Sequence, residues 1–159
     1  MTFEFEELMP INDCIKFYDE AILGKERANR LNPLRTFMNA GIMMSAGSDG
    51  PCTDPNPIDW LYKACNHSNK SESLTIKEAL RLCTYNGYWT TFDEKERGSL
   101  EVGKIADMVI LSSNPLNMKV EELNTLKVED TILGGKSYVE QKQSVLGIIF
   151  KGIFKRSRI

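Results

Sequence analysis

The strongest constraint on the fold is a short apolar run that ends at a carboxylate. Residues 42–46 are Ile-Met-Met-Ser-Ala, and Gly-Ser-Asp-Gly-Pro follows at residues 47–51. A run of this length closed by Gly and Pro predicts a buried strand, and its lack of alternation favours a parallel one. Asp49 would then stand at the carboxyl end of a sheet, where α/β proteins place their chemistry. Asp49 is therefore the first candidate for a working residue. A purely structural Asx cap of the turn explains the same residue, and both interpretations stay open.

The segments on both sides of this run have helical periodicity. Apolar residues over 13–23 fit one face of a short helix. Asn32-Pro33 predicts a helix start with an Asn cap, and Gly41 predicts its end. Asn56-Pro57 opens a further helix, and Thr75-Ile76-Lys77-Glu78 is a capping box that opens another. The order helix, strand, helix predicts an α/β fold.

From about residue 96 the chain changes character. Residues 107–111 read as a strand, and residues 128–133 and 136–139 flank Gly134-Gly135. A Gly-Gly pair between two such segments predicts a hairpin with a turn of a primed type. We therefore expect an α/β unit over residues 1–95 and a small β unit over residues 96–140.

The tail over residues 141–159 mixes apolar and basic residues. That spacing allows a basic amphipathic helix that lies on a membrane or in a partner's groove. Gly147 and Gly152 weaken such a helix, so we favour a tail that packs back on its own protein or frays, and we expect no membrane contact.

Charge, cysteine and histidine content exclude several classes of function. The net charge of −2 gives no general attraction to nucleic acid. The four cysteines, Cys14, Cys52, Cys65 and Cys83, form no Cys-x-x-Cys pair, which favours free thiols in a reducing cytoplasm. We read no secretory signal at the N-terminus and no apolar run long enough for a membrane span. The one histidine, His67, cannot by itself build a hydrolytic zinc site.

Other candidate residues have simpler interpretations. Cys52 could be a nucleophile, but no His or Lys is near it in sequence to lower its pKa. Asp54 could line the same site as Asp49 at the carboxyl end of the sheet, or it could be a solvated acid in a loop. His67 falls near the end of a helix, where the ring normally faces water rather than a metal. The aromatic residues over 85–89 could line a pocket, but packing against a neighbouring sheet explains them equally.

Residues 98–107 are Gly-Ser-Leu-Glu-Val-Gly-Lys-Ile-Ala-Asp, the most specific motif of the chain. With several other motifs, this run resembles amidohydrolase-superfamily enzymes of the amidohydrolase-3 group. The resemblance covers roughly residues 15–140, and its other motifs occur in the same order, at residues 23–27, 40–42, 47–51, 75–80 and 84–87. It implies the C-terminal part of a (β/α)8 barrel followed by strands of a small β-sandwich. Residues 42–46 would match the eighth barrel strand, residues 57–86 the helices after it, and residues 105–139 the sandwich.

The resemblance also implies a role for Asp49. In the family, the acid after the eighth strand takes the proton from the water on the metal and can contact the metal itself. The matching position here is Asp49, which is thus the implied catalytic residue and a possible metal ligand of the complete enzyme, with a divalent metal, zinc by resemblance. The family's histidine ligands on earlier strands have no counterpart in this chain and would lie N-terminal to Met1.

We therefore expect a C-terminal fragment of a metal-dependent hydrolase of C–N bonds other than peptide bonds, inactive alone. Its substrate would be a small molecule. The alternative is a non-catalytic binding or regulatory scaffold that kept this half-barrel. An incomplete barrel exposes strand edges, so we expect the chain to form a homo-oligomer or to bind the missing N-terminal part.

Overall fold

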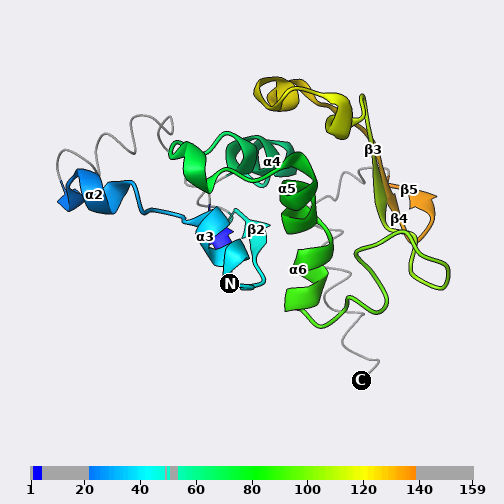
Figure 1. The fold of residues 1–159 in the computed structure, drawn as a ribbon. Coiled ribbons are helices and arrows are strands. Elements are labelled where there is room, and N and C mark those ends of the chain that lie inside the picture. Colours follow the sequence, from blue (N-terminus) through cyan, green and yellow to red (C-terminus); the bar gives the residue numbers. More distant parts are fainter. Residues whose placement is uncertain (1, 5–21, 49, 51–53, 139–159) are drawn as a thin grey trace, which may run out of the picture.

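A computed structural model describes residues 2–4, 22–48, 50 and 54–138 (Figure 1). Several sequence predictions lie outside these residues, namely those for Asp49, Cys14, Cys52, most of the helix over 13–23, and the tail over 141–159. They stay predictions.

The described elements alternate helices and strands in the first part of the chain and then turn to β structure. Their order is β1 (Thr2–Glu4), α2 (Lys25–Ala28), α3 (Leu34–Asn39), β2 (Ser45–Gly47), α4 (Pro57–Cys65), η2 (Lys70–Glu72), α5 (Ile76–Cys83), α6 (Tyr85–Thr90), β3 (Met108–Leu111), η3 (Pro115–Asn117), η4 (Val120–Thr125), β4 (Val128–Leu133) and β5 (Lys136–Ser137). The α/β class is therefore confirmed. Figure 1 shows α4, α5 and α6 between β2 on one side and the β3–β5 sheet on the other.

The strand predicted from the apolar run is present and parallel. Strand β2 pairs with β1 in parallel register, with Ser45 opposite Thr2 and Gly47 opposite Glu4. Its bounds differ from the predicted residues 42–46. Gly41 has a φ of 74°, and the Ile42 N–H donates to the Phe37 carbonyl, so these residues complete the turn out of α3 before the strand begins.

The predicted helix starts hold at α4 and α5 but not at α3. Asn56 caps α4 by accepting from the Ile58 N–H at 3.2 Å, and Thr75 with Glu78 forms the capping box of α5. At α3 the N-cap position belongs to Pro33, with no side-chain cap. Asn32 instead has a φ of 48°, a left-handed conformation that Asn adopts more readily than most residues.

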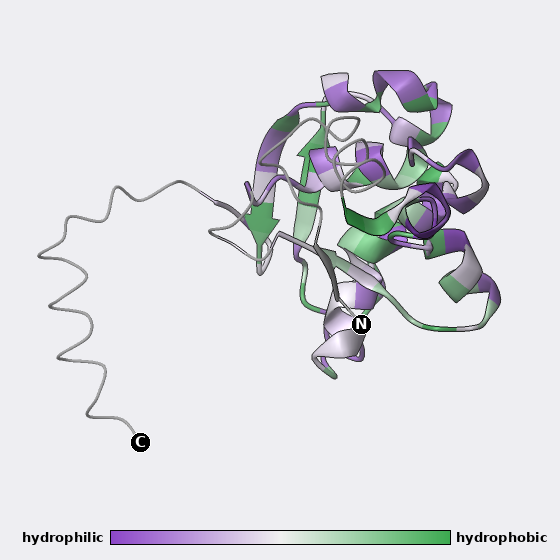
Figure 2. Ribbon diagram, turned by 90° about the vertical axis from the view of Figure 1, so that its left-hand side faces the viewer, coloured by the Kyte–Doolittle hydropathy of each residue, from purple (hydrophilic) through white to green (hydrophobic). Residues whose placement is uncertain are grey.

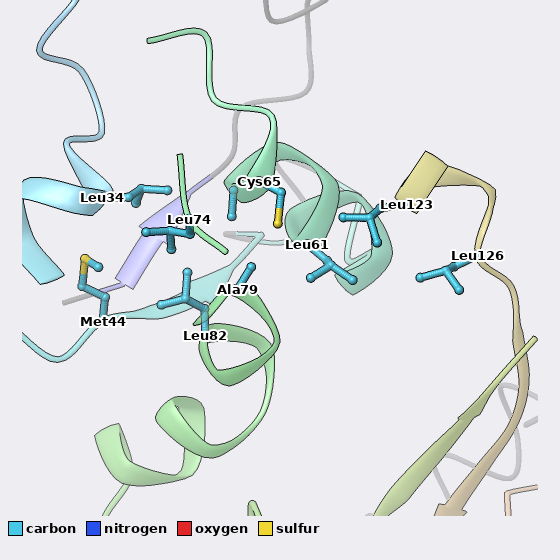
Figure 3. Close-up of a cluster of buried hydrophobic side chains, with 10 residues drawn as sticks. Leu34, Met44, Leu61, Cys65, Leu74, Ala79, Leu82, Leu123 and Leu126 are labelled. Atoms are coloured by element: carbon cyan, nitrogen blue, oxygen red, sulfur yellow. The ribbon is translucent and has the colours of Figure 1, made fainter. Parts of the chain in front are cut away.

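The core joins the helices to β2. Leu34, Met44 and Leu82 are almost fully inaccessible to solvent. Figure 3 shows that the cluster continues from the helices toward the β3–β4 strands. Its members come from α3, α4, α5, η4 and the adjoining segments: Leu34, Met44, Leu61, Ala64, Cys65, Leu74, Ala79, Leu82, Leu123 and Leu126. Because Leu111 of β3 packs against it, one apolar core connects the helical part to the sheet.

The second sheet is antiparallel and follows the predicted hairpin. Its strand order is β3-β4-β5, with a register irregularity between Ile110 and Leu111. Gly134 and Gly135 join β4 to β5 with φ values of 58° and 79°. Positive φ at both positions is the signature of a primed turn, so the hairpin prediction is confirmed.

The described helices are amphipathic. On α5, Ala79 and Leu82 are buried whereas Lys77 and Arg81 are exposed. Figure 2 shows the same alternation of hydrophilic and hydrophobic residues on other helices. Within the described part of the chain, no helix has the length and apolar character that crossing a membrane requires.

Candidate functional site

The candidate site is built around the carboxyl end of β2. The strand ends at Gly47, two residues before Asp49. Met44, Ser45 and Ser48 are buried, so the segment leading to this point is embedded in the protein. The Ser48 hydroxyl accepts from the Gly50 N–H at 3.2 Å. The role of Asp49 itself stays a prediction.

Helices α4, α5 and α6 all contact β2. The most specific of these contacts comes from Asn86 on α6. Its side chain is buried, and Nδ2 donates to the Met44 carbonyl at 2.7 Å, one residue before the strand begins. The sequence analysis placed Asn86 in the motif at residues 84–87 but assigned it no role. The signal for a role is a strongly polar residue between the aromatic residues of a short helix.

An ion pair fastens α3 to α5 beside this strand. Arg35 donates through Nη1 and Nη2 to the two Glu78 carboxylate oxygens, at 2.8 and 2.7 Å. Glu78 also accepts from the Thr75 N–H and hydroxyl in the capping box. The hydrogen bond from Arg35 is the main reason that the pKa of Glu78 falls from 4.5 to about 2.

The Glu78 carboxylate makes stability depend on acid pH. A folded-state pKa of about 2, below the ordinary 4.5, means that its contribution is complete above about pH 5 and is lost as the pH falls toward 2. We expect Glu78→Gln to lower the urea midpoint at pH 6 and to lower it much less at pH 2.5. Glu121→Gln, at an exposed carboxyl of η4, is the control. A Glu78→Gln deficit equal at both pH values would contradict this assignment.

His67, which the sequence predicted to face water, does so only in part. Helix α4 ends at Cys65, and the His67 ring beyond it is half-buried, with Nδ1 3.1 Å from the Asn69 N. Burial lowers the pKa of His67, which favours the neutral ring. Among the described residues, no three His, Cys, Asp or Glu side chains are grouped to hold a metal ion. These residues therefore do not form a metal centre by themselves.

The surroundings of the other candidate residues in the described part of the chain do not favour a chemical role. Cys65 and Cys83 are free thiols, as predicted, and burial raises their pKa values to about 11 and about 12. Such thiols are poor nucleophiles at neutral pH. Asp54 is exposed. Among the aromatic residues of α6, Tyr85 lies with its ring under the Arg81 guanidinium, 4.7 Å from the ring centroid.

The Gly-Ser-Leu-Glu-Val-Gly-Lys-Ile-Ala-Asp run connects α6 to the antiparallel sheet. Gly98 has a φ of 85° and lies so close to α6 that a Cβ would be 3.1 Å from the Tyr85 Cα. At the other end, Asp107 pairs with Arg97 and accepts from the Gly134 N–H of the hairpin turn at 2.8 Å. The most specific motif of the sequence is thus a structural linker in this part of the fold.

Comparison with known proteins gives the family. The amidohydrolase family model matches residues 9–139, which is most of the chain. This chain belongs to the amidohydrolase family.

Several curated relatives are longer proteins of which this chain matches one portion. It is 29% identical over 129 residues to the putative amidohydrolase YtcJ of Bacillus subtilis, covering 75% of this chain and 24% of the relative. With the N-substituted formamide deformylase of Arthrobacter pascens the identity is 31% over 113 residues, covering 67% and 21%. With the 5'-deoxyadenosine deaminase of Methanobrevibacter smithii it is 28% over 149 residues, covering 82% and 34%. The matched portion is thus about a fifth to a third of each relative.

Solved structures show the same kind of fold. An adenosine deaminase from Xanthomonas campestris with bound zinc matches 99% of this chain and 42% of its own, with a TM-score of 0.58 and 19% identity. An amidohydrolase from Thermotoga maritima matches 68% of this chain and 26% of its own, with a TM-score of 0.50 and 23% identity. At these identities the similarity concerns the fold.

Proposed function

We propose that this chain is the C-terminal portion of a metal-dependent amidohydrolase that cleaves C–N bonds other than peptide bonds, with Asp49 as its proton-transfer residue. The observation that carries the proposal is the parallel strand β2, which ends two residues before Asp49 in a chain of the amidohydrolase family. The match to only 21–34% of the relatives' lengths supports a portion of a longer enzyme. No observation favours the non-catalytic scaffold.

The proposed architecture has three parts. Residues 1–95 form a portion of a (β/α)8 barrel, residues 96–140 the C-terminal part of a β-sandwich, and residues 141–159 a basic amphipathic tail. The parallel pairing of β1 with β2, with α3 before β2 and α4 after it, supports the barrel portion. The antiparallel β3-β4-β5 sheet supports the sandwich.

In this enzyme Asp49 acts as a general base. A carboxylate at the end of a parallel strand takes a proton from the attacking water and delivers it to the departing nitrogen. A divalent metal, zinc by resemblance, belongs to the complete enzyme. The described residues offer no donor set for it, so its ligands, apart from a possible contact with Asp49, come from other segments.

The proposed partners are a small substrate and the segment that completes the barrel. Two relatives are named for their substrates, the N-substituted formamide deformylase and a 5-methylthioadenosine/S-adenosylhomocysteine deaminase, which supports N-substituted formamides and 5-methylthioadenosine as the substrates to test. Within the described residues, β1 and β2 form a two-stranded sheet, which leaves strand edges for pairing. The chain alone therefore forms a homo-oligomer or binds the missing N-terminal part.

The test uses the native polypeptide or complex that contains this chain, loaded with zinc. It is incubated with an N-substituted formamide and with 5-methylthioadenosine, and released amine or ammonia is measured. We expect turnover of one of these classes, and none by residues 1–159 alone. Failure of the metal-loaded protein to hydrolyse either class would count against the proposal.

A further inference from the structure

Only one of the two polar atoms of the buried Asn86 side chain makes a hydrogen bond among the described residues. Its Nδ2 donates to the Met44 carbonyl at 2.7 Å, but its Oδ1 is buried without a hydrogen-bond partner among the described residues. A buried amide is unfavourable unless its polar atoms are bonded. The orientation of this side chain is therefore set by the Met44 bond.

The segment that Asn86 holds borders an open pocket of about 270 Å³. The pocket is lined by residues 41–44, which form the turn between α3 and β2, by Met38, Glu78 and Arg81, and by Asn86 itself. Across the pocket this turn has no packing partner among the described residues, so packing alone constrains it less than a filled core would. The hydrogen bond from Asn86 supplies a directional constraint at the point where β2 begins.

The axial position of a strand decides where its carboxyl end lies. One residue of a strand spans about 3.3 Å. A misplacement of about 1 Å in a reacting group can lower a rate by roughly a hundredfold. A small shift of β2 would therefore carry the loop after Gly47 away from a productive position.

We propose that Asn86 is a positioning residue that fixes β2 along its axis through the Met44 carbonyl. This inference rests on the proposed function, because its effect on turnover depends on Asp49 following β2. The structural part, a strand held in place by Asn86, can be tested without turnover.

The structural test compares two asparagines with the same kind of bond. Asn66 Nδ2 donates to the Val120 carbonyl at 2.7 Å and joins α4 to η4. Leu has nearly the shape of Asn and removes the donor while keeping the volume. In residues 1–159, we expect Asn86→Leu to raise the hydrogen-exchange rates of the residue 45–47 amides about tenfold, as the loss of one hydrogen bond implies, and Asn66→Leu to leave them unchanged.

Asn86→Asp keeps the shape of the side chain and its acceptor oxygen, but a second carboxylate oxygen replaces the Nδ2 donor. If Asn86→Leu does not fold, Asn86→Asp takes its place in the exchange experiment, with the same result expected. Unchanged exchange over residues 45–47 in the folded variant would overturn the inference.

The functional test uses the complete, metal-loaded enzyme. We expect Asn86→Leu to lower kcat about tenfold or more, with KM and metal content unchanged, and Asn66→Leu to leave kcat unchanged. Full kcat in Asn86→Leu, in an enzyme that Asp49→Asn inactivates, overturns the inference. Full activity in Asp49→Asn instead overturns the proposed function, whatever the exchange rates show.

Discussion

Asp49→Asn in the complete enzyme is expected to lower kcat by roughly 10²- to 10⁴-fold, the contribution of a general base. The substitution keeps the shape of the side chain but removes its ability to accept a proton at neutral pH. Single-turnover kinetics at saturating substrate measure the effect on the chemical step.

Asp54→Asn is the matched control for this substitution. Asp54 is an exposed acid five residues further along the chain, and the same chemical change there should leave kcat near the wild-type value. If Asp54→Asn inactivates the enzyme while Asp49→Asn does not, the assignment of the base to Asp49 is wrong.

Leu82→Ala is expected to destabilise the chain by about 2–5 kcal/mol. Leu82 is 2% exposed and lies in the cluster that joins α5 to β2 and α4, so truncation removes buried methyl groups and leaves a cavity. Urea unfolding followed by circular dichroism gives the free energy of unfolding. The midpoint should fall while the slope with urea stays the same.

A leucine on the surface provides the control for Leu82→Ala. Leu100 is 73% exposed, so Leu100→Ala removes the same atoms from a site in water and should change stability by less than about 0.5 kcal/mol. Equal losses in the two variants would show that the cluster around Leu82 does not form the core.

Features set by neighbouring residues could be predicted from the sequence. The Asn56 cap, the Thr75–Glu78 capping box and the Gly134-Gly135 turn each depend on side chains or φ angles within about four residues. Strand β2 was also predicted as parallel and buried, because its apolar run does not alternate. Its bounds were displaced because the residues after Gly41 complete the turn from α3.

Features set by tertiary contact could not be predicted in the same way. Arg35 and Glu78 are 43 residues apart, and Asn86 and Met44 are 42 apart. No local pattern pairs such residues, so the ion pair and the Asn86 bond appear only in the fold. The partial burial of His67 has the same origin, since a polar sequence around a histidine does not reveal which segments pack over it.

The most direct test of the central claim is the composition of the native protein that contains these residues. An antibody against the antiparallel sheet region would capture it, and mass spectrometry and metal analysis would give the polypeptide masses and the bound metal. We expect either a polypeptide about three times the 18.0 kDa of this chain, because 149 matched residues are 34% of one relative and 113 matched residues are 21% of another, or a stable second chain that supplies histidines. We also expect a bound divalent metal. An 18.0 kDa polypeptide captured alone and without metal would contradict the claim.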